Sequence, residues 1–248
     1  MLEGKTLLVT GAGRGIGLKI VQTAVREGAN VVAHTGRGTS DSLQIDKLNP
    51  DQIHKVTGDL ADSNSLSGIW TDALAWKNRI DVLINNAGVY VASPVSPQAE
   101  WDQGWHTNLA VNLQAPADLC RLAIQHFQQT GEGIIINMAS RSSHRGDDAE
   151  HLAYGAAKGG LLALTRGIAR SYAASGTLAY AVAPAWVRTE MAEAHIASVG
   201  EDQITAQLPM REITPASDVA ETVVFLASGR ARHANGCTVD ITGADYVR

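Results

Sequence analysis

The sequence is poor in cysteine, in clustered basic residues and in long apolar runs. Of its 248 residues only Cys120 and Cys237 are cysteines, far apart and without metal-ligand neighbours, so we expect neither a disulfide framework nor a metal site. No block of lysine and arginine interrupts a chain of net charge -5, which argues against nucleic acid as a partner. No signal-like start is present, and no apolar run approaches the roughly 20 residues that span a bilayer. We therefore expect a cytoplasmic protein with no membrane partner.

What the chain does contain is enough apolar sequence for one large core, with 45% hydrophobic and only 18% charged residues. No linker or internal repeat divides it, which favours a single domain over residues 1–248. Short apolar runs alternate with longer stretches of helical spacing such as Ile16, Ile20 and Ala24. The predicted strands begin at Thr6, Asn30, Ile53, Asp81, Gly133, Thr177 and Thr238.

This alternation predicts an α/β fold. Continuously apolar strands indicate a sheet covered on both faces, and the right-handed crossover rule makes a doubly wound, seven-stranded parallel sheet the simplest arrangement. Residues 189–215 have weak periodicity, with polar and small residues alternating, and we interpret them as a mobile lid over a substrate.

A glycine-rich loop follows the first predicted strand directly. Residues 10–17 read T-G-x-x-x-G-x-G rather than the commoner G-x-G-x-x-G. Gly11 permits a sharp exit from the strand, Gly15 the approach of a phosphate, and Gly17 close packing of helix on sheet. Such turns also occur without a ligand, but this position in the fold favours a dinucleotide.

The end of the second predicted strand bears on the choice of cofactor. NAD-binding folds usually place an acidic residue there, but the sequence has none until Asp41. Arg14 and Arg37, with the hydroxyls of Thr35 and Ser40, suit a 2′-phosphate instead. We therefore expect NADP to be preferred, with NAD as the alternative if Arg37 is only a solvated loop charge.

Tyr154 and Lys158 stand alone among small residues in the stretch AYGAAKGG. Four residues apart on a helix, they share a face. A tyrosine pKa is ordinarily about 10, and a neighbouring ammonium favours the phenolate, which would let the side chain exchange a proton with an alcohol or carbonyl oxygen. By itself this pair is also compatible with a structural role.

Several motifs together resemble the short-chain dehydrogenase/reductase family over essentially the whole chain. They are TGAGRGIG, NNAG at Asn85, VNLQAP around Asn112, INMAS ending at Ser140, YGAAK, and APAWVRTEM. The resemblance implies a Rossmann-type sheet, a nicotinamide cofactor, hydride transfer between that cofactor and an alcohol or carbonyl carbon of a small molecule, and a homo-oligomer, usually a homotetramer.

The resemblance also implies site roles. Tyr154 resembles the general acid/base, Lys158 the group that lowers its pKa and holds the nicotinamide ribose, and Ser140 the hydroxyl that binds the substrate oxygen. Asn112 resembles the residue that holds a water on the proton path to Lys158. Asn108 is an alternative to Asn112, which the downstream NLQAPADLCR favours, and Ser142 is an alternative to Ser140 because the segment before Tyr154 is one residue longer than usual.

The cofactor contacts are predicted from the glycine loop, from the second strand and from the resemblance. Asp59 resembles the acid that meets the adenine amine, with helix capping as its alternative role, and Pro184, Val187 and Thr189 resemble the contacts of the nicotinamide amide. The full predicted set is Thr10, Gly11, Gly13, Arg14, Gly15, Ile16, Gly17, Thr35, Gly36, Arg37, Asp59, Leu60, Asn86, Ala87, Gly88, Tyr154, Lys158, Pro184, Val187 and Thr189.

Three positions depart from the family pattern: Ala185 and Ala244 stand where glycines are usual, and Tyr180 replaces an asparagine. The leading hypothesis is an NAD(P)(H)-dependent oxidoreductase acting on a secondary alcohol or ketone. A 3-oxoacyl thioester reductase is an alternative within the same chemistry, and a non-catalytic cofactor-binding scaffold or regulator is one outside it. The loop at residues 141–151 is expected to shape the substrate pocket together with the lid, and it carries His144, Arg145, Asp147, Asp148 and Glu150; the lid region adds Trp186, Met191 and His195.

Overall fold

The computed structural model describes residues 1–36 and 44–248, and a seven-stranded parallel sheet forms its centre. The strand order is β3-β2-β1-β4-β5-β6-β7, with the chain winding outward in both directions from β1 and β4. This confirms the doubly wound α/β fold and all seven predicted strands. Their bounds are β1 Thr6–Val9, β2 Asn30–Thr35, β3 Ile53–Thr57, β4 Val82–Asn85, β5 Gly133–Met138, β6 Thr177–Pro184 and β7 Thr238–Ile241.

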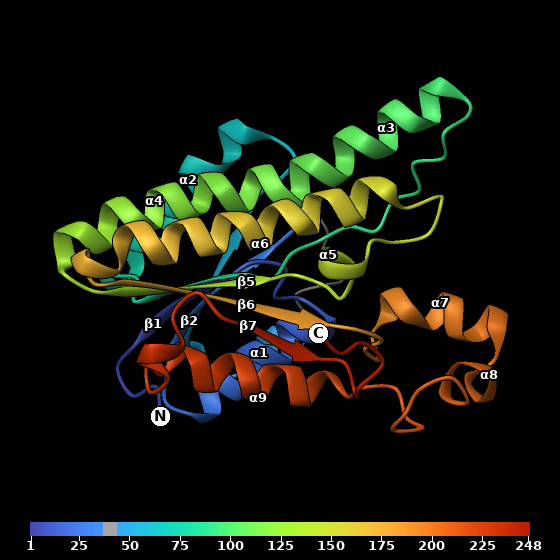
Figure 1. The fold of residues 1–248 in the computed structure, drawn as a ribbon. Helices are drawn as coiled ribbons and strands as arrows, with labels where there is room; N and C mark the ends of the chain where they lie inside the picture. The colour runs from blue at the N-terminus through green and yellow to red at the C-terminus, as the bar shows by residue number, and fades with distance from the viewer. Residues whose placement is uncertain (37–43) are drawn as a thin grey trace.

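Helices cover both faces of the sheet (Figure 1). One face carries α1 (Gly15–Arg26) and α9 (Ala216–Ala227), and the other carries α2 (Ser63–Lys77), α4 (Ala115–Thr130) and α6 (Leu152–Tyr172). A π-helical turn, Ala110–Gln114, joins α3 (Gln98–Leu109) to α4, so the two form one long rod. Three-residue 3₁₀ turns lie at Ile45–Lys47, Pro50–Gln52, Ala173–Ser175 and Arg232–Ala234.

The core lies in two layers because successive strand side chains point to opposite faces. In β1, Leu7 and Val9 pack with α1 and α9, whereas Leu8 packs with α2 and α4 on the other side. All three are fully buried. Strands covered on both faces need apolar residues at every position, which is why these runs lack the polar alternation of half-exposed strands.

Polar side chains link the central strands at their carboxyl ends. Asn85 and Asn137 are register partners in β4 and β5, and the Asn85 Nδ2 donates to the Asn137 Oδ1 at 2.8 Å. The Asn137 Nδ2 donates in turn to the Thr165 hydroxyl of α6 at 2.9 Å. These buried bonds tie α6 to the sheet beside the edge where the strand-to-helix loops meet.

The segment predicted as a lid contains two helices with a small core of their own, α7 (Glu190–Val199) and α8 (Glu201–Thr205). A parallel bridge pairs Val187 with Thr214, so the two ends of the segment lie side by side. The apolar side chains of Ile196, Ile204, Leu208 and Ile213 pack together beneath the helices. The helical periodicity of this segment is weak because these helices are short and bury little against the main core.

The three departures from the family pattern are accommodated locally. The Tyr180 hydroxyl donates to the Ala231 carbonyl at 3.0 Å, and its ring is fully buried. The Ala185 amide bonds to the Ile241 carbonyl at 3.2 Å, linking the ends of β6 and β7. Ala244 adopts a positive φ of 65°, a conformation that glycine tolerates better than alanine.

Candidate active site

A cavity of about 1120 Å³ opens at the carboxyl ends of the strands, where the predicted catalytic and cofactor residues meet. Ser140, Tyr154 and Lys158 line one part of it. Of the predicted cofactor residues, its walls include Gly11, Gly13, Arg14, Gly15, Ile16, Gly17, Thr35, Gly36, Asp59, Leu60, Asn86, Ala87, Gly88, Pro184, Val187 and Thr189. Thr10 and Asn112 support this cavity without lining it, and Arg37 and Ser40 lie outside the described residues.

The glycine loop and the start of α1 form an uncapped helix N-terminus at the cavity wall. Arg14, at the N-cap position, makes no side-chain capping bond, and the first turn of α1 carries no acidic side chain. The first backbone N–H groups of a helix have no partner within it and attract anions. Gly11 and Gly15 adopt positive φ angles of 65° and 52°, which bend the chain into this turn. The donor set therefore fits a pyrophosphate.

Thr10 and Asn86 brace this loop from below. The Thr10 hydroxyl accepts hydrogen bonds from the backbone N–H groups of Asn86 and Ala87, both at 3.0 Å. The Asn86 Nδ2 donates to the carbonyls of Thr10 at 2.9 Å and Gly11 at 3.1 Å. Thr10 is 2% exposed, and its hydroxyl holds the loop after β4 against the glycine loop.

His34 is a cavity residue that no motif in the sequence singles out. At the end of β2 it lies between two loops: its Nε2 is 3.2 Å from the Gly58 carbonyl, and its Nδ1 is 3.5 Å from the Gly11 amide. Burial lowers the pKa of its imidazole, and the bond to Gly58 partly offsets that effect. The neutral ring therefore joins the first and third strand-to-helix loops.

Asp59 lies in the loop after β3, at the cavity wall. Its Oδ1 accepts from the Ala61 amide at 2.9 Å, while the N-cap of α2 is Asp62, whose side chain accepts from the Asn64 amide. The capping role considered for Asp59 thus belongs to Asp62. Asp59 is exposed and faces the cavity beside Leu60.

Tyr154 and Lys158 extend from the first turns of α6 into the cavity. The Lys158 Nζ lies 5.8 Å from the centre of the Tyr154 ring and donates to the Met138 carbonyl at 2.7 Å. Burial raises the pKa of Tyr154, and the nearby Ser140 hydroxyl partly opposes that rise. The pKa of Tyr154 is thus raised rather than lowered as predicted: burial of the phenol dominates, and the opposing effects come from Ser140 and Arg141 rather than from Lys158. Burial also lowers the pKa of Lys158, to about 8.

Ser140, rather than Ser142, presents its hydroxyl next to Tyr154. The Ser140 Oγ accepts from the Ser142 amide at 3.1 Å, which leaves its own proton to donate. The Ser142 hydroxyl donates instead to the Asp147 Oδ2 at 2.6 Å and is thereby oriented away from that role. The geometry favours Ser140 as the hydroxyl that meets a substrate oxygen.

Asn112 lies in the π-helical turn between α3 and α4 and is fully buried. Its Oδ1 accepts from the Val89 amide at 3.0 Å, and its Nδ2 donates to the Val89 carbonyl at 2.8 Å. A Cβ added to Gly88 would lie 2.9 Å from the Asn112 Oδ1 and 3.5 Å from the Lys158 Nζ, so both side chains face this glycine. Asn108 does not contact Val89: it donates to the Val91 and Gly104 carbonyls at 2.8 Å, and its Oδ1 accepts from the Asn112 Nδ2 at 3.2 Å. π-Turns inside helices are frequent at functional sites.

Tyr90 forms a wall of the cavity that sequence reasoning missed. Its ring meets Tyr154 edge-on at 4.8 Å and stacks on His151 at 3.8 Å. Its hydroxyl donates to the Asp147 Oδ1 at 3.2 Å, and burial raises its pKa. The position two residues after NNAG is the only sequence signal for it.

Lys158→Met is expected to raise the free energy of unfolding at pH 7 by about 1–3 kcal/mol, because the native state buries an ammonium there. The native pKa of about 8 lies below the ordinary 10.5. Between these values the unfolded chain binds more protons, so wild-type stability gains as pH rises and the advantage of the variant shrinks. Urea unfolding at pH 7 and pH 10 measures this difference.

The matched control is Lys19→Met, which removes an exposed ammonium of α1 and should show little pH-dependent difference from wild type. The expectation would be contradicted by a Lys158→Met variant that is less stable than wild type at pH 7. It would also be contradicted if the variant exceeded the wild type in free energy of unfolding by the same amount at both pH values.

Among the residues that the structure describes, no group of three or more histidine, cysteine, aspartate or glutamate side chains could hold a metal ion. Within the same residues, no helix combines the length and apolar character needed to cross a bilayer.

Comparison with known proteins gives a consistent result. The family model described as enoyl-(acyl carrier protein) reductase, adh_short_C2, matches residues 11–243. The 3-oxoacyl-[acyl-carrier-protein] reductase FabG of Staphylococcus aureus is 28% identical over 246 residues, covering 98% of each chain. FabG of Salmonella typhimurium is 30% identical over 248 residues, covering 99% of this chain and 98% of its own.

Solved structures resemble the fold over the whole chain as well. A Brucella melitensis protein described as a short-chain dehydrogenase/reductase, glucose/ribitol dehydrogenase, is 26% identical at a TM-score of 0.90 and covers 100% of this chain and 98% of its own. A candidate NAD(P)-dependent gluconate 5-dehydrogenase of Beutenbergia cavernae, with NADP bound at low occupancy, is 33% identical at a TM-score of 0.89, covering 98% and 97%. With the cavity and its residues, these matches show that the chain belongs to the short-chain dehydrogenase/reductase family of NAD(P)-dependent oxidoreductases.

Proposed function

We propose that the cavity binds a nicotinamide dinucleotide along the glycine loop and reduces or oxidises a small carbonyl or alcohol compound beside Ser140 and Tyr154. The observation that carries this proposal is a single cavity that runs from the uncapped start of α1 to the Ser140 and Tyr154 hydroxyls. The nicotinamide, when bound, supplies or accepts the hydride. The protein supplies the proton and the binding contacts.

In carbonyl reduction, the Tyr154 hydroxyl donates its proton to the substrate oxygen as negative charge develops there. The high pKa set by burial keeps this phenol protonated at neutral pH, which suits an acid. The Ser140 hydroxyl donates to the same oxygen and stabilises its charge. In the reverse direction the phenolate accepts the alcohol proton, a step that the ammonium of Lys158 favours.

Lys158 and Asn112 replenish that proton from the helix side of the cavity. With a pKa of about 8, the lysine is mainly protonated at pH 7 and releases its proton more readily than an ordinary lysine. Asn112 holds the Val89 backbone next to Gly88, and it fixes the wall behind the lysine. We assign it the support of a water-mediated path to Lys158.

The remaining contacts position the cofactor and cover it. Pro184, Val187 and Thr189, at the end of β6 and the base of the lid segment, are assigned to the nicotinamide amide. A Cβ on Gly15 would lie 3.3 Å from the Thr189 Cγ2, so the lid base adjoins the glycine loop. We propose that residues 189–215 act as a lid that excludes water from the reacting atoms.

The test is to mix the purified protein with NADPH or NADH and a panel of ketones, oxo acids, sugars and 3-oxoacyl thioesters, and to follow the absorbance of the reduced nicotinamide. Oxidation of the cofactor by at least one class of carbonyl compound is expected. Cofactor binding without turnover of any compound, in either direction, would instead favour a non-catalytic cofactor-binding scaffold or regulator.

A 3-oxoacyl thioester reductase is the second candidate, and the FabG relatives are the observation that favours it. The gluconate 5-dehydrogenase relative favours a polar acid instead. The two candidates share their chemistry and differ only in the substrate walls, so the same panel separates them.

We further propose a preference for NADP(H). No acidic side chain follows β2 up to Gly36, and Arg14 lines the cavity with an exposed guanidinium whose ion pair to Glu190 is long, at 3.5 Å. NADPH is expected to bind more tightly than NADH. Arg14→Gln should raise the Kd of NADPH about tenfold and leave the Kd of NADH nearly unchanged. Fluorescence titration measures both constants. Tighter binding of NADH by the wild type would overturn this preference.

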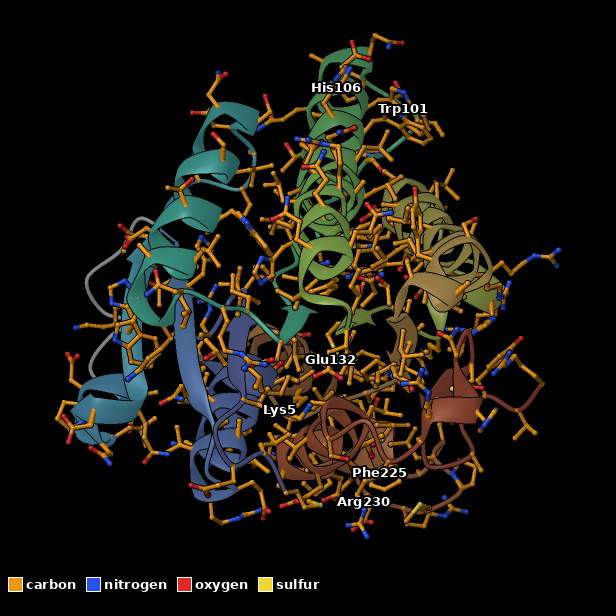
Figure 2. All side chains as sticks on the ribbon, turned by 90° about the vertical axis from the view of Figure 1, so that its left-hand side faces the viewer. Lys5, Trp101, His106, Glu132, Phe225 and Arg230 are labelled. Atoms are coloured by element: carbon orange, nitrogen blue, oxygen red, sulfur yellow. The ribbon has the colours of Figure 1, made fainter. Side chains whose placement is uncertain are left out.

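We also propose that the protein forms a homo-oligomer, with a tetramer as the family's usual form, and that it is cytoplasmic. The half-exposed Phe225 of α9, in the segment that precedes β7, offers one apolar contact for a second copy (Figure 2). Light scattering of the purified protein measures the assembly, and a monomer would exclude the tetramer.

A further inference from the structure

A side cavity of about 250 Å³ adjoins the main cavity beneath the lid segment. The side chains of Arg141, Arg145 and Trp186 line both cavities and thus form their common wall. The rest of the side cavity is lined by lid residues, among them the apolar Ile204 and Leu208, and by Asp245 near the C-terminus. Arg141 directly follows Ser140, so this chamber begins next to the hydroxyl that meets the substrate.

The two arginines bring more positive charge to this wall than their neighbours neutralise. Arg141 pairs with Asp245 and lies over the Trp186 ring, 5.3 Å from its centre. The Arg145 guanidinium forms no ion pair or hydrogen bond with any other residue that the structure describes. Burial and the adjacent charge of Arg145 together lower the pKa of Arg141 to about 10, which indicates a partly desolvated cation.

Two acidic residues of the same loop, Asp147 and Asp148, have hydrogen-bond partners of their own, although the charge of Asp147 also acts on Arg141. Asp147 accepts hydrogen bonds from the Ser142 and Tyr90 hydroxyls at 2.6 and 3.2 Å. Burial acts to raise the pKa of Asp148, but the pairing with His151 at 2.7 Å and the backbone hydrogen bonds from Glu150 and His151 together lower it. Among the described residues that line the side cavity, Asp245 therefore provides one carboxylate, whereas Arg141 and Arg145 provide two guanidinium groups.

We propose that Arg141 and Arg145 form a subsite for an anionic group of the substrate, and that this group is the carboxylate of a small oxo or hydroxy acid. The inference deepens the proposed function and rests on it. A planar guanidinium matches a carboxylate through paired hydrogen bonds, and a partly buried one gains most from an anion. Because Arg141 is the immediate neighbour of Ser140, the anion and the reacting carbon belong to one short molecule. The hydroxyls of such a molecule would face Tyr90 and Asp147 across the main cavity.

The experiment compares each acid with a neutral molecule of the same shape. The kcat/KM of the wild type is measured for 4-oxopentanoate and 5-oxohexanoate and for the corresponding oxo amides, with saturating cofactor. The wild type is expected to prefer the acid of the fitting length. Arg145→Gln should lower kcat/KM for that acid by about 10- to 100-fold. It should change kcat/KM for the corresponding amide less than about twofold.

Arg145 is exposed and its substitution leaves no buried partner, so this variant should fold. The matched control is Arg230→Gln, which removes the same charge beyond the end of α9, outside both cavities (Figure 2). It should retain the wild-type preference. As a second variant, Arg141→Gln combined with Asp245→Asn removes both charges of the partly buried pair and should abolish the preference for the acid.

A binding measurement separates failure of the subsite from failure of the reaction. Succinate, but not succinamide, should raise the melting temperature of the wild type in the presence of cofactor, and Arg145→Gln should lose that shift. The subsite is overturned if amides and acids are turned over equally, or if Arg145→Gln keeps the preference. If a phosphorylated ketone is preferred over every oxo acid, the bound group is a phosphate, and the proposal that it is a carboxylate is overturned. Absence of all turnover with the succinate shift intact would refute the proposed reaction and keep the anion site.

Discussion

Replacing Tyr154 by phenylalanine is expected to lower kcat by about 10²- to 10⁴-fold, the range in which a positioned general acid contributes to catalysis. The change removes only the hydroxyl. The ring that packs edge-on against Tyr90 at 4.8 Å stays, so the wall of the cavity is preserved. Steady-state kinetics with any substrate found in the carbonyl panel measures kcat, and fluorescence titration should show the Kd of the cofactor changed by no more than a few-fold.

Tyr172→Phe is the matched control, because it removes the same hydroxyl from the last residue of the same helix, outside the cavity. It should retain full activity. If Tyr154→Phe keeps a kcat within tenfold of wild type, Tyr154 is not the acid.

Ser140 and Ser142 can be compared in the same assay. Loss of activity in Ser140→Ala, with activity retained in Ser142→Ala, would support Ser140 as the hydroxyl that meets the substrate oxygen.

Gly17→Ala is expected to cost about 3 kcal/mol of folding free energy and to raise the Kd of the cofactor at least tenfold. Gly17 packs in the first turn of α1, where a Cβ would overlap the Gly11 carbonyl oxygen and lie 2.5 Å from the Asn86 Nδ2. Relieving that overlap must push α1 away from the glycine loop and break the bonds from Asn86 that brace it. Urea unfolding and cofactor titration measure the two effects.

The matched control lies in another helix. Gly68, in α2, is exposed, and a Cβ added there would meet no atom within 4 Å beyond its own stretch of helix. Gly68→Ala should therefore stabilise the protein by about 0.5–1 kcal/mol through helix propensity. The same substitution thus has opposite signs at the two glycines. A Gly17→Ala variant with wild-type stability and cofactor affinity would show that α1 can shift without disturbing the loop.

Most of the fold could be predicted because the strands of a doubly wound sheet are covered on both faces. Burial on both sides demands continuous apolar runs, and those runs stand out between the amphipathic helices at all seven strand positions. The segment at residues 189–215 is harder to predict. Its helices α7 and α8 bury their apolar residues mainly against one another, so they produce only a weak periodicity along the chain.

Those parts of the site can be predicted whose geometry follows from the spacing of residues within one turn or one helix. The T-G-x-x-x-G-x-G loop and the Tyr154 and Lys158 pair depend on local turn and helix geometry, which spacing records directly. Roles that depend on contacts are not visible in the sequence. The hydroxyl of Thr10 accepts from the amides of Asn86 and Ala87, and Asp62 caps α2.

Electrostatics is the part that sequence could not supply. A lysine four residues after a tyrosine suggests a lowered phenol pKa, but the pKa of Tyr154 is raised because desolvation of the phenol exceeds the effect of neighbouring charges. Desolvation depends on every atom packed around a group, and those atoms come from segments far apart in the chain. The same holds for Arg141, whose partners Trp186 and Asp245 come from the chain just before α7 and from near the C-terminus.

The sequence by itself determined the order of strands and helices, the glycine turn and the placing of Tyr154 and Lys158 on one face of a helix, since these follow from local backbone preferences and from the periodicity of burial. Only the tertiary structure decided where His34 and Tyr90 lie and which two arginines border the side cavity. The physical reason is that hydrogen-bond partners, burial and local charge are properties of side chains brought together by folding, and no spacing along the chain encodes them.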